Sequence, residues 1–490
     1  MTSTTERHSL SGVDTTTTTA RQFINGKLVG SKKESTSTSP TDGSFLGRYA
    51  DADEEQAREA VAAARTAFAN TDWSRDRRLR HLVLNGIADA IERRTDELVS
   101  LLARENGKVL GEAGFELSLT VPKLRYYAAL ALSESGRAAE VAPGLHMSSV
   151  PEPIGVAGVI VPWNSPVVLS VRSFAPALAA GCTAVVKLPG QTGLVNGLLH
   201  EILSEVAGLP AGVLNSLTES GDQLARFLVS SKDVDVLSYT GSTRVGRQIM
   251  AAAAGTLKRL SLELGGKTPM IVFDDADLDV VVPVLTKAVT TFSGQFCMTG
   301  SRVLAQAGIA DELRERLSRS LAAVKVGPGD DPASDMGPMI DAENARRVDA
   351  LVSAAAEYAT VLVRGGLSEP NTAFYHPSLL EVDDPTSPIV QEEVFGPVAT
   401  FEVFESEGDA VRLANVTQYG LAASIWSRDI DRPRRVGRQL RAGTVWTNTW
   451  ALVADQFEEG GFGQSGLGRL NGMRGLEEFQ EYKTYAQIVA

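Results

Sequence analysis

The chain has 490 residues, 43% of them apolar, and a net charge of −13. These values are typical of a folded protein of roughly two to four domains and exclude a wholly disordered chain. The acidic excess argues against a nucleic-acid partner. The two cysteines, Cys182 and Cys297, are too few for a disulfide scaffold or a thiolate zinc site, so we predict no metal. No apolar run is long enough for a membrane helix, so we expect a cytoplasmic protein without a membrane partner.

The N-terminal segment predicts a tail followed by a hairpin. Residues 1–19 include eleven Ser and Thr and no long apolar stretch. Such a segment buries too little surface to offset its ordering entropy, so we predict disorder over 1–19. We expect order to begin at Gln22, because Asn25–Gly26 between two short apolar runs is typical of a two-residue hairpin turn.

Two long helices are predicted next. Asp51 or Asp53 is placed to cap the first helix, in which apolar residues recur at helical spacing over 57–68. The second is predicted as one continuous helix over 78–104 that ends at Asn106–Gly107, because Asn-Gly is a common helix stop.

From residue 154 the pattern changes to short β-rich runs separated by helical stretches. The runs are 154–161, 183–188, 213–217, 234–239 and 258–264. This alternation predicts a parallel, doubly wound sheet. Because ligands of such sheets bind at the carboxyl ends of the strands, we expect one rim to hold Trp163–Asn164, Lys187, Gly241–Ser242 and Glu263. A second α/β unit is predicted over about 268–460.

Cys297 is the first candidate for chemistry. Gly294 and Gly300 on either side allow a close approach of the backbone to a ligand. Consecutive backbone N–H groups near a helix start would lower the pKa of the thiol and bind an oxyanion. The alternative is a buried, inert thiol, which is what we expect of Cys182 in its apolar strand.

Three further segments at the predicted rim carry polar groups. Glu263 lies among leucines at a strand end, where desolvation would raise its pKa as a general base near neutrality requires; an ion pair with Lys267 or an arginine is the alternative. The amide of Asn164 can donate to an oxyanion, although the residue is also suited to a simple turn. Gly241–Ser242 follows a strand and opens a helix, a geometry that can seat a phosphate.

Six segments occur together and in one order along the chain. They are Trp163–Asn164, Val185–Lys187, Tyr239–Thr243, Leu262–Lys267, Gly294–Cys297 and Gln391–Val398. As a set they resemble the aldehyde dehydrogenase superfamily, over roughly residues 22–487. The resemblance implies a hydrolytic, NAD(P)-dependent oxidoreductase. Such an enzyme oxidises an aldehyde to the carboxylic acid through a cysteine thiohemiacetal and a thioester.

The resemblance also implies residue roles. Cys297 matches the nucleophile, Glu263 the base that activates the deacylating water, and Asn164 the side-chain half of the oxyanion hole. Lys187 matches the lysine that binds the adenosine ribose. The expected NAD or NADP site consists of Ile160, Pro162, Trp163, Lys187, Gly190, Gly221, Gly241, Ser242, Val245, Leu264, Glu393 and Phe395.

The family fold implies a Rossmann-like parallel-sheet cofactor domain, an α/β catalytic domain and a small β arm for oligomerisation. Strand-rich segments at 137–153 and 476–489 agree with such an arm, so a homodimer or homotetramer is expected. The implied boundaries are 20–136 and 154–266 for the cofactor domain, 267–470 for the catalytic domain, and 137–153 and 471–490 for the arm.

Three departures from the family pattern concern specificity. Gly190 replaces a glutamate that often binds the ribose of NAD, which leaves the choice between NAD and NADP open. Glu459 and Arg172 stand where tunnel-lining aromatic residues are common, so a polar aldehyde is expected, such as a semialdehyde or a polar aromatic or heteroaromatic aldehyde. The alternative is that these two side chains simply pair. The expected substrate walls are Leu169, Arg172, Phe296, Met298, Trp450 and Glu459.

Two other functions compete with this reading. A CoA-acylating semialdehyde dehydrogenase is disfavoured because such relatives generally lack the base at Glu263. A non-catalytic binding protein on the same fold would be expected to lose Cys297, Glu263 or Asn164, and all three are present.

Overall fold

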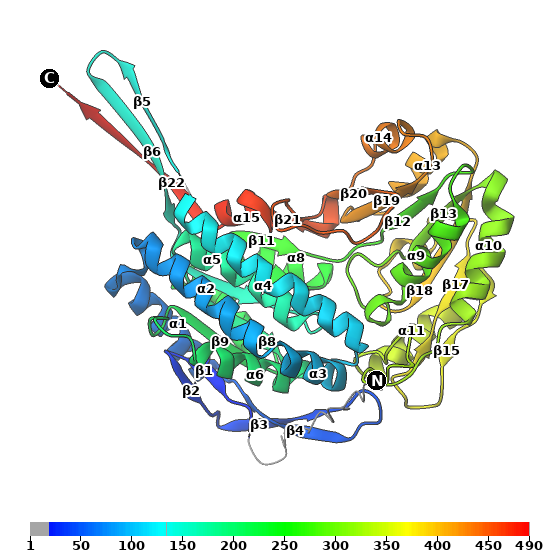
Figure 1. Ribbon diagram of the computed structural model, residues 1–490, viewed down its shortest axis with the longest axis horizontal. Coiled ribbons are helices and arrows are strands. Elements are labelled where there is room, and N and C mark those ends of the chain that lie inside the picture. The colour runs from blue at the N-terminus through cyan, green and yellow to red at the C-terminus, as the bar shows by residue number, and fades with distance from the viewer. Residues whose placement is uncertain (1–18, 134, 490) are drawn as a thin grey trace, which may run out of the picture.

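The structure is a computed structural model that describes residues 19–133 and 135–489. The predicted tail over 1–19 lies outside the described residues except for Thr19. Two α/β bodies lie side by side, and a three-stranded arm projects from the first of them (Figure 1). Among the described residues, no helix is both long and apolar enough to cross a membrane.

The first body contains an eight-stranded sheet of order β2-β1-β9-β8-β7-β10-β11-β21. Its strands are β1 (Gln22–Ile24), β2 (Lys27–Val29), β7 (Val156–Ile160), β8 (Thr183–Pro189), β9 (Leu214–Glu219), β10 (Val236–Thr240), β11 (Arg259–Glu263) and β21 (Gly466–Leu467). The five central strands, β9, β8, β7, β10 and β11 in sheet order, are parallel, as predicted. β7 and β10 are buried along their whole length, because helices cover both faces of a parallel sheet. The predicted hairpin is confirmed: β1 pairs with β2, and Asn25 and Gly26 have φ of 50° and 74°.

Helices pack on both faces of this sheet. They are α1 (Glu54–Asn70), α2 (Arg77–Arg93), α3 (Thr95–Asn106), α4 (Leu110–Ser133), α5 (Pro166–Ala180), α6 (Gly193–Ser204), α7 (Gln223–Ser230) and α8 (Thr243–Ala253). The predicted cap of α1 is confirmed, since the Asp53 carboxylate accepts the Gln56 N–H at 3.0 Å. Buried alanines along α1 allow this helix to lie close to the sheet.

The single helix predicted over 78–104 is wrong, because two helices occupy this stretch. The backbone leaves the helical conformation at Arg94, where φ is −112° and ψ is 20°. The Arg94 guanidinium there pairs with Glu97 of the next helix at 2.8 Å. No glycine or proline marks the break, so the sequence carries no stop signal. The predicted end is confirmed, since Gly107 closes α3 in the left-handed conformation with φ of 85°.

The second body contains a seven-stranded sheet of order β14-β17-β18-β13-β12-β19-β20. Its strands are β12 (Pro269–Val272), β13 (Arg302–Gln306), β14 (Thr360–Val363), β17 (Ser378–Glu381), β18 (Val398–Phe404), β19 (Ala422–Trp426) and β20 (Thr444–Thr447). All pairings except that of β14 are parallel. Helices α9 (Leu278–Thr290) and α10 (Ala307–Ala322) pack beside this sheet. One strand departs from the predicted division: β21 joins the edge of the first sheet, because its backbone pairs with β11.

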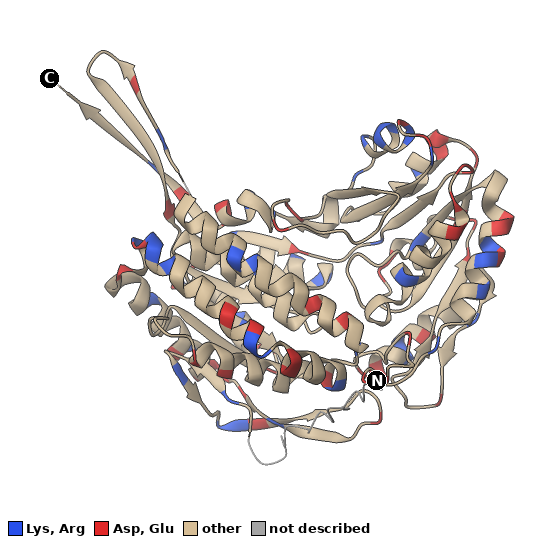
Figure 2. Ribbon diagram, in the orientation of Figure 1, with Lys and Arg blue, Asp and Glu red and all other residues tan. Residues whose placement is uncertain are grey.

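The arm is an antiparallel sheet of β5 (Arg137–Ala142), β6 (Leu145–Pro153) and β22 (Gln480–Ile488). The strand predicted over 476–489 is therefore shorter at its start, because a helical turn, α15 (Gly472–Glu477), packs against α5 first. Side chains along β5 and β22 are almost all exposed. The outer part of the arm is mostly uncharged (Figure 2).

Candidate active site

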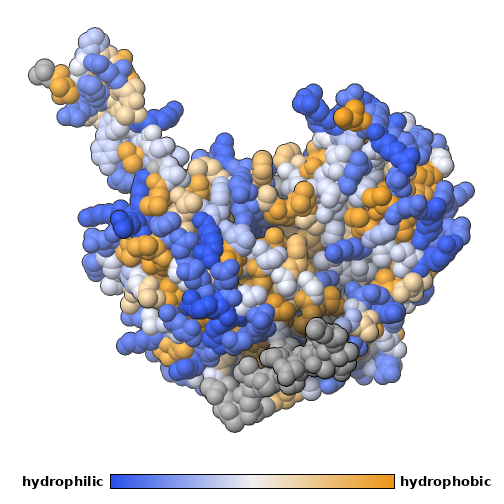
Figure 3. Space-filling view, in the orientation of Figure 1, coloured by the Kyte–Doolittle hydropathy of each residue, from blue (hydrophilic) through white to orange (hydrophobic). Residues whose placement is uncertain are grey.

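A cavity with about 690 Å³ of atom-free space reaches Cys297. Its walls come from both bodies, since α4 and α5 contribute one side and the Cys297 loop contributes the other. A second, more open cavity shares Phe115, Phe292, Phe296 and Ala451 with it. Hydrophobic residues gather along the meeting of the two bodies in Figure 3. The two cavities therefore adjoin at these shared residues.

Cys297 lies in a tight turn in which the Thr299 N–H donates to the Phe296 carbonyl at 3.0 Å. The segment before this turn is unusual, since Phe292 and Ser293 have φ of 53° and 55°. Burial raises the pKa of the Cys297 thiol to about 12, while the positive charge of Arg172 lowers it. The predicted lowering of this pKa at a helix start is therefore wrong, because the cysteine lies in a turn and its burial dominates.

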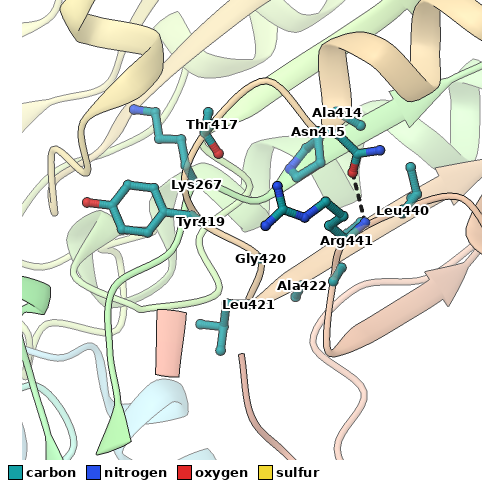
Figure 4. A pocket seen from close by; sticks show the side chains of 13 residues that line it. Lys267, Ala414, Asn415, Thr417, Tyr419, Gly420, Leu421, Ala422, Leu440 and Arg441 are labelled. Carbon is teal, nitrogen blue, oxygen red and sulfur yellow. Dashed lines mark hydrogen bonds between the residues drawn. The ribbon is translucent and has the colours of Figure 1, made fainter. Parts of the chain in front are cut away.

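Glu263 is the last residue of β11 and is only 4% exposed. Burial raises the pKa of this carboxyl to about 7, as predicted. Its Oε1 atom is buried and has no hydrogen-bond partner within the described residues. The alternative of an ion pair with Lys267 is not found there. Lys267 instead projects beside Tyr419 into a separate small pocket (Figure 4).

Asn164 connects the loop after β7 to the segment that precedes the cysteine. Its Nδ2 donates to the Gln295 carbonyl at 3.0 Å in buried surroundings. The loop is held from the other side by Asn106, whose amide donates to the Trp163 carbonyl at 2.8 Å. Asn164 lines the same cavity as Cys297, so its amide can turn toward a ligand there.

Arg172 and Glu459 pair with each other and also line the cavity. Arg172 Nη1 lies 3.1 Å from Glu459 Oε2, and its Nη2 donates to Thr240 Oγ1 at 2.9 Å. The third guanidinium nitrogen, Nε, is buried without a partner among the described residues. The guanidinium lowers the pKa values of both Glu263 and Cys297.

Two more buried ion pairs border the cavity, and the sequence did not suggest them. Glu116 on α4 pairs with Lys108 and accepts the Val167 N–H at the start of α5 at 2.9 Å. Lys123 pairs with Asp455. These partners are eight and more than 300 residues apart in sequence, so no short motif marks them.

The predicted apolar walls are found in part. Leu169, Phe296 and Met298 line the cavity at Cys297. Trp450 lies one layer further out, on the outer cavity, where its Nε1 donates to the Met298 carbonyl at 2.8 Å. Its ring meets Phe296 edge-on with centroids 5.9 Å apart. Trp450 therefore positions the wall around the thiol.

The predicted cofactor residues lie along the carboxyl ends of the parallel strands. Lys187 and Ile160 are register partners of β8 and β7. Ser242 Oγ caps α8 by accepting the Val245 N–H at 3.4 Å, and a Cβ on Gly241 would lie 2.2 Å from the Tyr239 hydroxyl. Bare backbone at a helix start is suited to a pyrophosphate. These residues differ in exposure: Ser242 and Gly221 are exposed, Pro162 is half-buried, and Ile160 and Leu264 are buried.

Other predicted cofactor residues lie near the cysteine, since a Cβ on Gly266 would lie 2.6 Å from the Cys297 carbonyl. Trp163 meets Phe395 edge-on at 5.6 Å, and Phe395 holds a positive φ of 53°. Glu393 Oε1 accepts the Gly266 N–H at 3.0 Å, while burial raises the pKa of this carboxyl to about 7. Hydrogen-bonding groups thus lie both at the strand ends of the first sheet and beside the Cys297 loop, an arrangement that fits a dinucleotide.

Gly190 has no room for any side chain. A Cβ there would lie 2.6 Å from the Tyr49 hydroxyl and 2.8 Å from Ser220 Cα. A carboxylate does stand nearby on the next strand, at Glu219, which sequence reasoning missed. The predicted strand ended at residue 217, and its observed extension to 219 is what would have marked Glu219 as a strand-end residue.

The fold and the thiol-bearing cavity define an α/β protein with a candidate catalytic cysteine, and its similarity to known proteins identifies the family. The profile of the "Aldehyde dehydrogenase family" matches residues 28–485. Betaine aldehyde dehydrogenase of Bacillus subtilis (strain 168) is 38% identical over 470 residues, covering 94% of this chain and 96% of the relative. Succinate-semialdehyde dehydrogenase of Paenarthrobacter nicotinovorans is 36% identical, covering 89% and 97%.

A solved structure of betaine aldehyde dehydrogenase from Staphylococcus aureus in complex with NAD+ is 34% identical. It matches with a TM-score of 0.93 over 96% of this chain and 95% of that chain. The chain therefore belongs to the aldehyde dehydrogenase family. It is an NAD(P)-dependent aldehyde dehydrogenase that works through a catalytic cysteine.

Proposed function

We propose that this enzyme oxidises a polar aldehyde to its carboxylic acid, with Cys297 as nucleophile, Asn164 in the oxyanion hole and Glu263 as general base. The proposal assigns cofactor binding to the first body and the nucleophile to the second. The observation that carries it is the shared cavity, in which the thiol and a guanidinium stand together.

Cys297, Asn164 and Glu263 each have a separate role in the proposed oxidation. The Cys297 thiolate attacks the carbonyl carbon, and the Asn164 amide donates to the oxygen that becomes negative. A bound nicotinamide would accept the hydride that leaves this carbon, and loss of the hydride leaves a thioester on Cys297. Glu263 then removes a proton from water, which hydrolyses the thioester on Cys297 to the acid. A carboxyl with a pKa of about 7 suits this last step, because it is basic enough to accept a proton and largely ionised at neutral pH.

The cavity supports a substrate that carries a hydrogen-bond acceptor several atoms from its carbonyl. The charges of Arg172 and Glu459 balance each other, so no net ionic charge is demanded of the substrate. Arg172 Nε, however, is a buried donor without a partner in the described part of the chain, which costs about 1–3 kcal/mol until it is satisfied. A heteroatom or carboxylate of the substrate can accept from it, whereas an alkyl tail cannot.

Two nearly isosteric pairs of aldehydes test this specificity. Pyridinecarboxaldehyde is compared with benzaldehyde, and succinic semialdehyde with pentanal, by reduction of NAD+ at 340 nm. We expect the polar member of at least one pair to have the higher kcat/KM, by about tenfold. Arg172→Leu should remove that preference and barely change the KM of propanal. The double variant Arg172→Leu/Glu459→Leu controls for the carboxylate left unpaired in the single variant. Decanal as the best substrate would contradict the polar cavity.

The mode of release separates this proposal from a CoA-acylating enzyme. Product analysis with and without CoA should give the free acid in both cases, because Glu263 activates water. Formation of acyl-CoA at a rate that exceeds hydrolysis would contradict the role of Glu263. Lack of any turnover with the whole panel would instead mean that the substrate lies outside the proposed class.

We also infer that the arm pairs with a second copy of the chain. Its sheet has unpaired edge strands and exposes Tyr482, Tyr485 and Ile488, a combination that favours pairing with another strand or sheet. Light scattering after size exclusion should give a dimer or tetramer, and removal of residues 480–490 should shift it toward the monomer. The cytoplasmic location stays a prediction.

A further inference from the structure

The adenosine end of the proposed cofactor groove lies at the ends of β8 and β9. Lys187 of β8 is the cation there, and Gly190 follows this strand without room for a side chain. A carboxylate at 190 would require Tyr49 and Ser220 to move. A carboxylate that binds a ribose at this end, beside Lys187, therefore has to come from another residue.

Glu219 is placed to supply it. It is the last residue of β9 and is 2% exposed. In the parallel register Glu219 pairs with Pro189, two residues after Lys187, so Glu219 and Lys187 face the same side of the sheet. Its Oε1 accepts the Leu224 N–H at 2.8 Å, at the start of α7. Its Oε2 is buried and has no hydrogen-bond partner in the residues that the structure describes.

The charges around Lys187 single out Glu219. Three carboxylates act on this lysine: Glu219, Asp51 and Asp222. Asp51 has its own cation in Lys33 at 2.6 Å and also accepts from Ser35 and Ser220. Asp222 pairs with Arg226 at 2.8 Å. Within the described residues Glu219 makes no ion pair, so one of its oxygens remains available to a ligand.

We propose that Glu219 binds the ribose hydroxyls of the adenosine and makes the enzyme select NAD+ over NADP+. The carboxylate accepts a hydrogen bond from the 2′-hydroxyl of NAD+ and repels the 2′-phosphate of NADP+. Glu219 supplies this carboxylate from the adjacent strand, because position 190 has no room for a side chain. The inference rests on the proposed function, which assigns cofactor binding to the first body, and on the expectation that Lys187 binds the adenosine ribose.

The alternative is a purely structural role, in which Glu219 only caps α7. Its bond to the Leu224 N–H is a capping interaction, and capping contributes to stability without distinguishing the two nucleotides. Glu219→Gln separates the roles. The amide keeps an oxygen that can accept from Leu224, and it removes the charge that repels a phosphate.

The test is equilibrium binding of NAD+ and of NADP+ by calorimetry, without aldehyde, to the full chain, together with the melting temperature. We expect the wild type to bind NAD+ at least about a hundredfold more tightly than NADP+, or ~2.7 kcal/mol. Glu219→Gln should shrink this ratio at least about tenfold, or ~1.4 kcal/mol, with little change in Tm. Asp222→Asn is the matched control, because it removes a neighbouring, exposed carboxylate, and its ratio should stay within about twofold of the wild type.

Three outcomes would overturn the inference. One is a wild type that binds NADP+ as tightly as NAD+. Another is a ratio of NADP+ to NAD+ affinity in Glu219→Gln that stays within threefold of the wild-type ratio, which would leave Glu219 only the capping of α7. If that variant does not fold, Glu219→Asp serves instead, and discrimination that survives with unchanged NAD+ affinity would count against the role. Binding of neither nucleotide to the wild type would overturn the proposed function itself.

Discussion

Two carboxylates end parallel strands of one sheet, yet their surroundings prepare them for different tasks. Glu263 ends β11 near enough to Cys297 for its charge to raise the pKa of the thiol, burial raises its own pKa to about 7, and its Oε1 has no donor among the described residues. Glu219 ends β9, where N–H groups at the start of α7 hold one oxygen and Lys187 lies nearby. Burial raises the pKa of Glu219 too, but these donors and the lysine oppose it.

Position at a strand end therefore brings a side chain to the proposed cofactor site, while the neighbouring element decides the chemistry of that side chain. A carboxyl without donors gains and loses a proton near neutrality, which suits a base. At a helix N-terminus the helix dipole and its N–H groups favour the anion of a carboxyl and oppose the effect of burial on its pKa. We therefore expect variants at Glu263 and Cys297 to change the chemical steps, and variants at Glu219 and Lys187 to change nucleotide binding.

The largest effect is expected from Cys297→Ala. Loss of the nucleophile should lower turnover by more than about a thousandfold, because the covalent step needs the thiolate. Calorimetry should show NAD+ affinity nearly unchanged, since the groove is intact. Cys182→Ala is the matched control: this thiol is fully buried in the core, with its pKa raised to about 12, and its removal should preserve turnover. Turnover of a few per cent in Cys297→Ala would contradict the assignment.

Glu263→Gln should separate acylation from deacylation. Steady-state turnover is expected to fall by about a hundredfold, within the range of general-base contributions. Stopped-flow traces should then show a burst of NADH, roughly one per active subunit, before the slow phase. Glu478→Gln is the control, because Glu478 acts on Glu263 only electrostatically. The side-chain oxygen of the glutamine can still accept the Arg469 N–H. Uniform slowing without a burst would argue against the base.

The pH dependence of the slow hydrolytic step should follow the same carboxyl. Glu263 acts only when ionised, and its pKa of about 7 means that activity is lost as pH falls through neutrality. Deacylation should therefore rise roughly tenfold from about pH 6 to about pH 8. Single-turnover hydrolysis of the acyl-enzyme across this range is the measurement. A flat profile would mean that another group activates the water.

Lys187→Met should act at the binding end alone. Loss of the ammonium is expected to weaken NAD+ binding by about tenfold, ~1.4 kcal/mol, while kcat at saturating NAD+ changes less than about twofold. Calorimetry and initial rates give the two quantities separately. Lys33→Met is the control, because Lys33 is already paired with Asp51. A fall in kcat that equals the loss of affinity would erase the distinction between the two ends.

The smallest effect is expected on the reactivity of the thiol. The Arg172 guanidinium lowers the pKa of Cys297, so Arg172→Leu should raise that pKa further and slow alkylation by iodoacetamide about threefold at fixed pH. The double variant with Glu459→Leu should recover part of this rate, because the carboxylate also raises the pKa of the thiol. Faster alkylation in Arg172→Leu would show that access to the thiol, and not charge, controls its reactivity.

Much of this architecture was predictable from the sequence because it depends on local patterns. Alternating strands and helices gave the parallel sheet, and the strand-end rule brought Lys187, Ser242 and Glu263 to one edge. The burial of Glu263 followed from its leucine neighbours. The break at Arg94 was missed because no glycine or proline marks it, and ion pairs such as Lys123–Asp455 join positions too distant for any motif.

Other features were decided only by the packed chain. The pKa of Cys297 depends on how deeply its turn is buried, which the flanking glycines do not reveal. The pairing of Arg172 with Glu459 across the cavity required two segments 287 residues apart to meet. Whether Gly190 leaves the ribose unrecognised depends on Tyr49 and on Glu219 of the adjacent strand. The local sequence determines which groups reach the groove, and their protonation and partners follow from desolvation and contacts that only tertiary packing creates.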